Sequence, residues 1–345
     1  MACGALAMQA AGIEIEKYIA YEVDKYAIQT AKHNFPFIEE RGDVFKADFT
    51  EYAGFDYLIG GSPCTYWSIA QTKNRETVAS GMGWELFSQY VRALHEAKPR
   101  FFLYENNKSM SAAIRASITE TFGFEPILIN SALVSAQNRQ RLYWCGIRQA
   151  DGTYKKADIQ QPTDRGILLK DILETNGNGA GVRDDGKRHV LTASYDGAVI
   201  WNSIERHQRT MVAEPICLNP KSGRAGVEGL QPSLQDRVYD IVGKMPAVTS
   251  SFNPRIAEPL RENEATKDVP IYEVKDGYIT VKGKQYPIKL VDGFYIIRKL
   301  TVREYMRLQT VPEWYEWPVS KSQAYKMLGN GWTVEVIAHL LRGLK

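Results

Sequence analysis

The sequence is poor in cysteine, and the cysteines that it has are scattered. Among 345 residues there are four, at Cys3, Cys64, Cys145 and Cys217, and no two form a C-x-x-C pair. Disulfide scaffolds and zinc sites need paired spacing, so the sequence excludes both and indicates a reducing cytoplasm. The five histidines also lack the spacing of metal ligands, and we expect no bound metal.

Long apolar runs are absent as well. No stretch of about 18 apolar residues occurs, so we expect no membrane-spanning segment. The first basic residue is Lys17, so the apolar start lacks the basic region of a signal peptide. Lys and Arg total 43 against 40 Asp and Glu, a net charge of +3 that permits a nucleic-acid partner without requiring one.

Segments typical of strands and helices alternate through residues 1–150. Strand-like runs occur at 18–21, 55–59, 100–104, 127–129 and 142–145. Helix-like segments stand between most of them, and Asp24 is a candidate N-cap for a helix that ends at Asn34. This alternation predicts an α/β fold with a doubly wound, mostly parallel sheet.

The amino-acid composition changes after residue 150. Residues 151–297 are rich in glycine and turn pairs and predict a separate, mainly β domain, with a hairpin around residues 278–281. Helical patterns return in residues 298–345. The chain therefore divides into an α/β domain, a β domain and a C-terminal helical segment.

Three side chains that could bind a ligand or react with it follow predicted strands. Glu22, Cys64 and Glu105 each come directly after one, and Gly60-Gly61 breaks the strand before Cys64. Taken singly, a carboxylate at a strand end more often only makes a surface loop hydrophilic, and a free cysteine is more often a small apolar residue buried in the core. Because strand ends meet at one edge of such a sheet, three together indicate a ligand site with a nucleophile.

Five motifs then occur in a fixed order. They are Ser62-Pro63-Cys64 with Ser68, Glu105-Asn106, the Q-x-R-x-R run of residues 137–141, the R-x-L-T-x-R-E run from Arg298 with Arg307-Leu308-Gln309, and Gly329-Asn330. In order and spacing they resemble the DNA (cytosine-5) methyltransferase family of bacteria and phages over nearly the whole chain.

The resemblance implies a Rossmann-like, S-adenosylmethionine-dependent methyltransferase sheet with an inserted, mainly β target-recognition domain. It implies methyl transfer to carbon 5 of a cytosine flipped out of duplex DNA, through a covalent adduct with Cys64. Glu105 would hold a proton at ring nitrogen 3, which needs a neutral carboxylic acid. Arg139 and Arg141 would hold the base carbonyl and a nearby phosphate.

The resemblance also assigns binding residues. Those for S-adenosylmethionine are Cys3, Gly4, Glu22, Val23, Asp43, Val44, Pro63, Leu86 and Asn330. Those for DNA are Ser68, Arg237 and Thr249. The loop after Cys64, with Tyr66, Trp67, Lys73 and Arg75, is expected to close over the base.

The sequence departs from the family pattern at its start, at Thr65 and Trp67 in the nucleophile loop, at Asn107, and after Gly329-Asn330. The F-x-G-x-G strand that opens the family is absent before Gly4, and we expect a longer natural form that begins upstream. Gly331-Trp332-Thr333 follows the last motif, as in the branch with animal de novo and some phage enzymes.

Other functions remain open. The same machinery could methylate cytosine in transfer RNA, or the chain could be a catalytically silent DNA-binding relative. For the enzyme we expect a monomer in the cytoplasm of a bacterial or phage-infected cell, with a cognate restriction endonuclease as a possible partner.

Overall fold

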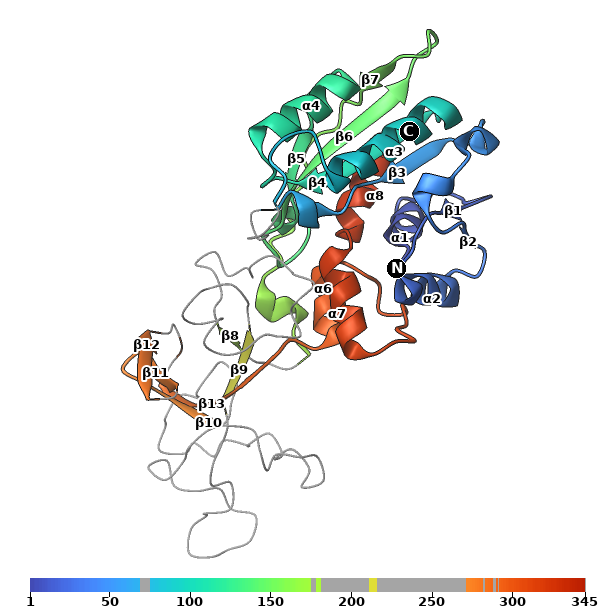
Figure 1. Cartoon of the computed structure of the whole chain (residues 1–345). Helices are drawn as coiled ribbons and strands as arrows, with labels where there is room; N and C mark the ends of the chain where they lie inside the picture. Colours follow the sequence, from blue (N-terminus) through green and yellow to red (C-terminus); the bar gives the residue numbers. More distant parts are fainter. Residues whose placement is uncertain are drawn as a thin grey trace, which may run out of the picture.

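The structure is a computed structural model that describes residues 1–68, 75–174, 178–180, 211–215, 271–281, 283–287, 290 and 292–344 (Figure 1). The helices are α1 (Cys3–Ala10), α2 (Lys25–Asn34), α3 (Met82–Ala97), α4 (Ala112–Phe122), α6 (Val302–Leu308), α7 (Lys321–Asn330) and α8 (Val334–Gly343). Among the described residues, none of these helices is long and apolar enough to cross a membrane.

The strands fall into three sheets. The central sheet contains β3 (Tyr57–Gly60), β4 (Phe101–Asn107), β6 (Gln140–Arg148) and β5 (Ile127–Asn130), in that order, with β7 (Tyr154–Lys156) paired to β6. A small sheet pairs β1 (Ile19–Ala20) with β2 (Glu39–Glu40). The third sheet contains β8 (Asn178–Ala180), β9 (Met211–Pro215), β10 (Ile271–Lys275), β11 (Tyr278–Val281), β12 (Lys284–Pro287) and β13 (Gly293–Arg298).

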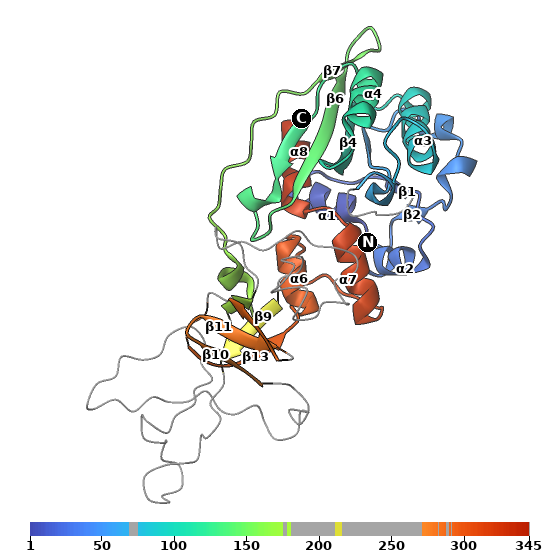
Figure 2. The same ribbon diagram turned by 60° about the vertical axis from the view of Figure 1, so that its left-hand side comes forward.

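Strand β4 lies at the centre of a helix–sheet–helix sandwich, and all seven of its residues are buried. Its side chains alternate between two cores, as strand geometry requires. Phe101 and Leu103 face the core built with α1 and α8, whereas Phe102 and Tyr104 face the core built with α3 and α4. Figure 2 shows α3 and α4 on one side of the sheet and α8 on the other.

The central sheet is mixed, and the expectation of a mostly parallel sheet is wrong. Strands β3 and β4 are parallel, but β6 runs antiparallel to both β4 and β5. Parallel neighbours need a crossover of a dozen or more residues, usually a helix. Residues 131–139 join β5 to β6 with only the short 3₁₀ segment Ser131–Leu133, so β6 returns in the opposite direction.

Three further expectations change. The strand predicted at 18–21 is the two-residue β1, which pairs with β2 and not with the central sheet. Glu105 lies inside β4, because this strand continues to Asn107. The boundary at residue 150 is too early, because β7 is paired with β6 as part of the central sheet.

The predicted hairpin in the third sheet is confirmed. Strands β10 and β11 pair antiparallel across the turn Asp276-Gly277. Both turn residues have positive φ, 53° and 74°, as the tight turns favoured in β-hairpins require. In Figure 1 this sheet lies to one side of the central sandwich, joined to it by the segment that leads into α6.

A buried carboxylate fixes the point where the chain returns from the third sheet. Glu304, on α6, is fully buried and accepts hydrogen bonds from both terminal nitrogens of Arg298, at 2.9 Å each. It also accepts from the backbone N–H of Thr301 (2.7 Å) and Glu174 (3.0 Å). Burial is the largest single influence and raises the pKa of Glu304, but the hydrogen bonds from Arg298, Glu174 and Thr301 and the charge of Arg298 together outweigh it, so the pKa is lowered.

We expect Glu304→Ala to destabilise the protein by about 3 kcal/mol or more, because Arg298 would keep a partly buried charge without its carboxylate. Urea unfolding measures this change, and Glu120→Ala, at an exposed site on α4, should cost less than about 0.5 kcal/mol. Because the pKa of Glu304 is lowered on folding, its contribution is present above its unfolded pKa and is lost as pH falls through the folded value. Equal unfolding free energies for the two variants would contradict this account.

Candidate active site

A large cavity opens beside the edge strand β3. Its volume is about 1480 Å³, and its lining runs from β1 and β3 to the loop between α7 and α8. All nine residues predicted to hold the cofactor line it: Cys3, Gly4, Glu22, Val23, Asp43, Val44, Pro63, Leu86 and Asn330. Glu105, Arg139 and Arg141 line it as well. The structure thus brings together residues that are separated by up to about 330 positions in the sequence.

The turn that leads to Cys64 lies against the backbone of β4. Gly60 is paired with Tyr104 in the parallel register of β3 and β4, so Gly61 comes next to Glu105. A Cβ atom built at Gly61 would lie 2.4 Å from the carbonyl oxygen of Glu105, so no larger residue fits without a shift. This glycine therefore permits the close approach of the two strand ends.

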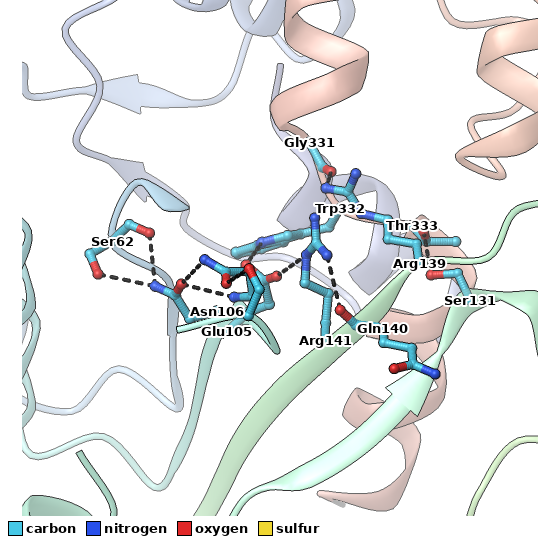
Figure 3. A network of polar contacts seen from close by, with 12 residues as sticks. Ser62, Glu105, Asn106, Ser131, Arg139, Gln140, Arg141, Gly331, Trp332 and Thr333 are labelled. Atoms are coloured by element: carbon cyan, nitrogen blue, oxygen red, sulfur yellow. Dashed lines mark hydrogen bonds and ion pairs between the residues drawn. The ribbon is translucent and has the colours of Figure 1, made fainter. Parts of the chain in front are cut away.

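Two buried side chains then hold Ser62. The side-chain amide of Asn106 donates to the Ser62 carbonyl at 3.1 Å (Figure 3). The hydroxyls of Ser62 and Tyr104 lie 2.6 Å apart. Cys64 follows at the start of the 3₁₀ segment Cys64–Tyr66. The segment that carries the predicted nucleophile therefore begins from a fixed turn beside Glu105.

The Glu105 carboxylate receives a donor on each oxygen. The Nε atom of Arg141 lies 3.0 Å from its Oε1, and the indole N–H of Trp332 donates to its Oε2 at 3.1 Å (Figure 3). Glu105 and Arg141 keep only 11% and 13% of their side-chain surface exposed. Each oxygen of the Glu105 carboxyl group is thus held by a donor from a different segment of the chain.

The contact of Trp332 with Glu105 was missed by sequence reasoning. The two residues are 227 positions apart, and Trp332 was singled out only as a departure from the family pattern. Local sequence carries no sign of this contact, because it depends on how the loop between α7 and α8 returns to the sheet.

Arg139 holds that same loop in place. It is 4% exposed, and its terminal nitrogens donate to the carbonyls of Gly329 (3.2 Å) and Gly331 (2.8 Å). Gln309 donates to the Gly331 carbonyl as well (3.1 Å). The described contacts of Arg139 therefore fix the backbone on either side of Asn330, whereas Arg141 directly contacts the carboxylate.

The end of the cavity around Glu22 combines a carboxylate with exposed apolar side chains. The Oε1 atom of Glu22 accepts from the backbone N–H of Val23 (2.8 Å) and Asp24 (2.9 Å). Val23 and Phe45 line the cavity and are 74% and 43% exposed, which is unusual for side chains of this kind. This end can receive a flat apolar ring and a pair of hydroxyl groups.

The other described cysteines are poor nucleophiles. Cys3 lines the cavity and Cys145 lies in the core beneath it, and burial raises the pKa of each thiol. A neutral buried thiol is much less reactive than a thiolate.

The remaining predicted residues lie elsewhere. Ser68 is half-buried and is not part of the cavity lining, and Arg237, Thr249 and Lys73 lie outside the described residues. Trp67 is fully buried, and Arg75 donates to the backbone carbonyls of Trp67 (3.2 Å) and Ser109 (2.7 Å). Trp67 is thus held in the core and Arg75 against the backbone, and neither residue lines the cavity.

This geometry has a counterpart among known proteins. The sequence model of the C-5 cytosine-specific DNA methylase family matches residues 2–345. The chain belongs to this family. It is therefore a methyltransferase enzyme with an α/β methyltransferase fold, as its motifs predicted.

Similar DNA methylases occur in bacteria and phages. The chain is 28% identical over 338 residues to the type II methyltransferase M1.ScrFI of Lactococcus lactis subsp. cremoris, which covers 94% of this chain and 70% of that protein. It is 25% identical over 414 residues to the orphan methyltransferase M.SPRI of Bacillus phage SPR, covering 98% and 94%. A mutant of Spodoptera frugiperda DNMT2 has a TM-score of 0.57 at 15% identity, covering 99% and 96%, and shows the shared fold alone.

The position of Trp332 leads to a prediction for this methylase. Trp332→Phe keeps an aromatic ring but removes the N–H that Glu105 accepts, so we expect kcat to fall about tenfold. Steady-state methyl transfer measures this change. Trp314→Phe, at a side chain that is 52% exposed and outside the cavity, is the matched control and should stay within about twofold. Unchanged turnover in Trp332→Phe would show that the indole N–H does not position Glu105.

Proposed function

We propose that the chain transfers a methyl group from S-adenosylmethionine to carbon 5 of a cytosine flipped out of duplex DNA, with Cys64 as nucleophile. The observation that carries this proposal is that the predicted catalytic and cofactor residues line one shared cavity. Its lining combines the Gly61–Pro63 turn before Cys64, the Glu105–Arg141 ion pair and the Glu22 carboxylate.

The residues at the Glu22 end fit the cofactor. Within the described part of the chain, the second carboxylate oxygen of Glu22 accepts no hydrogen bond, so it is available to the ribose hydroxyls. Val23 and Phe45 would flank the adenine, with Asp43 and Val44 beside them. Pro63, Leu86, Asn330, Cys3 and Gly4 would surround the rest. When bound, S-adenosylmethionine supplies an electrophilic methyl group on a positively charged sulfur.

The chemistry assigned to Cys64 follows from the weakness of carbon 5 as a nucleophile. The thiolate forms a bond to carbon 6 of cytosine, and the electron pair of the ring double bond becomes available at carbon 5. Carbon 5 would then take the methyl group that the bound cofactor supplies, and the electron pair of the broken carbon–sulfur bond would remain on the cofactor sulfur. Loss of the carbon 5 proton to water restores the double bond and expels the Cys64 thiolate.

Glu105 and Arg141 have separate roles in this proposal. The Glu105 carboxyl shares a proton with ring nitrogen 3, so that charge does not build up on the ring during attack. We expect Glu105 to carry this proton when the base is bound. Arg141 would then face the base carbonyl, and Arg139 acts through the loop around Asn330.

Recognition of duplex DNA is assigned to the middle of the chain. Residues 151–297, apart from β7 in the central sheet, would form an inserted target-recognition domain, which contains most of the third sheet and the predicted contacts Arg237 and Thr249. The cost of flipping a base, a few kcal/mol, would be met by contacts in the cavity and along the phosphates. We expect the chain to act as a monomer on DNA in a bacterial or phage-infected cell.

The test is transfer of labelled methyl from S-adenosylmethionine to mixed-sequence duplex DNA, with transfer RNA as a parallel substrate. Label recovered as 5-methylcytosine in DNA is the expected result. Label in transfer RNA alone would reject DNA as the substrate, and no label in either would reject the proposed activity.

A further inference from the structure

We propose that Glu76 is a positioning residue that holds the nucleophile segment against the start of α3. The inference rests on the proposed function. Glu76 lies outside every motif of the sequence, and its side chain is half-buried. It does not line the cavity, so it would act through the residues that it holds.

The Glu76 carboxylate joins two pieces of chain. Its Oε2 accepts from the indole N–H of the buried Trp67 (2.9 Å), which directly follows the segment Cys64–Tyr66. Its Oε1 accepts from the backbone N–H of Gly83 (3.1 Å), in the first turn of α3. The backbone N–H of Glu76 also donates to the Tyr66 carbonyl (2.9 Å). One side chain thus fixes the end of the nucleophile segment relative to a helix.

Two glycines leave room for this carboxylate. A Cβ atom at Gly81 would lie 2.5 Å from Oε1 of Glu76, and one at Gly83 would lie 2.6 Å from Oε2. Gly81 is also the N-cap of α3, and no side chain of its own caps the helix. The carboxylate supplies that cap from outside, where the helix dipole favours a negative charge.

The same helix reaches the cavity one turn later. Leu86 and Tyr90 of α3 line the cavity, and the Tyr90 hydroxyl donates to the Leu58 carbonyl of β3 (3.2 Å). Through Glu76, the segment that begins with Cys64 and the helix that borders the cofactor region share one anchor. Loss of this anchor should misplace the nucleophile while the cofactor region remains formed.

Two variants test the anchor in different ways. Glu76→Gln keeps the shape, but its amide offers only one acceptor to two facing N–H donors. Gly83→Ala keeps the charge but places a methyl group where the carboxylate and the Trp67 indole meet. Glu85→Gln is the matched control, because Glu85 carries the same charge in the same first turn of α3 and is exposed.

The readout is the rate of covalent adduct formation with duplex DNA that contains 5-fluorocytosine, in which fluorine cannot leave carbon 5 as a proton does. We expect both variants to slow the adduct about tenfold, with the cofactor dissociation constant within about twofold of wild type and Glu85→Gln unchanged. If both variants formed the adduct at the wild-type rate, or if cofactor binding weakened as much as the rate, the proposed role of Glu76 would be rejected. The proposed function would not be affected by either result. A wild-type protein that forms no adduct would reject the proposed function itself.

Discussion

Replacing the Cys64 thiol by a hydroxyl abolishes methyl transfer: for Cys64→Ser we expect a loss of at least about 10⁴-fold in single-turnover rate. A serine hydroxyl is far less acidic than a thiol and has no base assigned to activate it, so attack on carbon 6 fails. The trapped adduct with 5-fluorocytosine DNA should disappear with it.

The control for this result is Cys145→Ala. Cys145 is 1% exposed on β6, and burial raises the pKa of its thiol, so its removal tests for a general effect of losing a cysteine. We expect some loss of stability and methyl transfer within a few-fold of wild type. Substantial methylation by Cys64→Ser, or an adduct that persists in it, would remove Cys64 from the mechanism.

Glu105→Gln should lower the single-turnover rate by about 10²- to 10⁴-fold. A glutamine keeps the shape of the side chain and can still accept from Arg141 or Trp332. It cannot exchange a proton with ring nitrogen 3, so the charge that develops on the ring is no longer neutralised. Cofactor binding should change little, because Glu22 and the other residues of that end are untouched. A rapid-quench assay with saturating DNA separates these two effects.

Glu125→Gln is the matched control for this variant. It weakens an exposed ion pair with Arg115 (2.8 Å), and neither residue lines the cavity. Its rate should remain near that of wild type. A Glu105→Gln rate within tenfold of wild type would mean that the proton at nitrogen 3 comes from elsewhere.

Much of the local structure could be predicted from sequence because its causes are local. Asp24 caps α2, which runs from Lys25 to Asn34 as expected, and its carboxylate accepts from the Tyr26 N–H (2.9 Å). The glycine pair before Cys64 was expected to end the strand, and β3 ends at Gly60. Grouping the motif residues at one site also required only the order of strands and their ends.

What could not be predicted depends on contacts between distant segments. The direction of β6 follows from the absence of a helix between two strands, which a search for strands and helices does not weigh. The contacts of Arg139 with the Gly331 carbonyl and of Trp332 with Glu105 join segments 192 and 227 positions apart. Trp67 was read as a loop residue because its neighbours are polar, yet its ring is fully buried. Neither the periodicity nor the composition of the local sequence indicates any of these contacts.

The packing of α1 against α8 and the contact of Trp332 with Glu105 have a consequence for synthesis of the protein on the ribosome. Glu105 emerges from the ribosome 227 residues before Trp332, which completes its surroundings. A nascent chain therefore cannot assemble the cavity until the loop around Trp332 has been translated. Contacts of such long sequence separation also slow folding, because a long loop must close before they form. The cavity would thus become complete only after this loop has emerged from the ribosome.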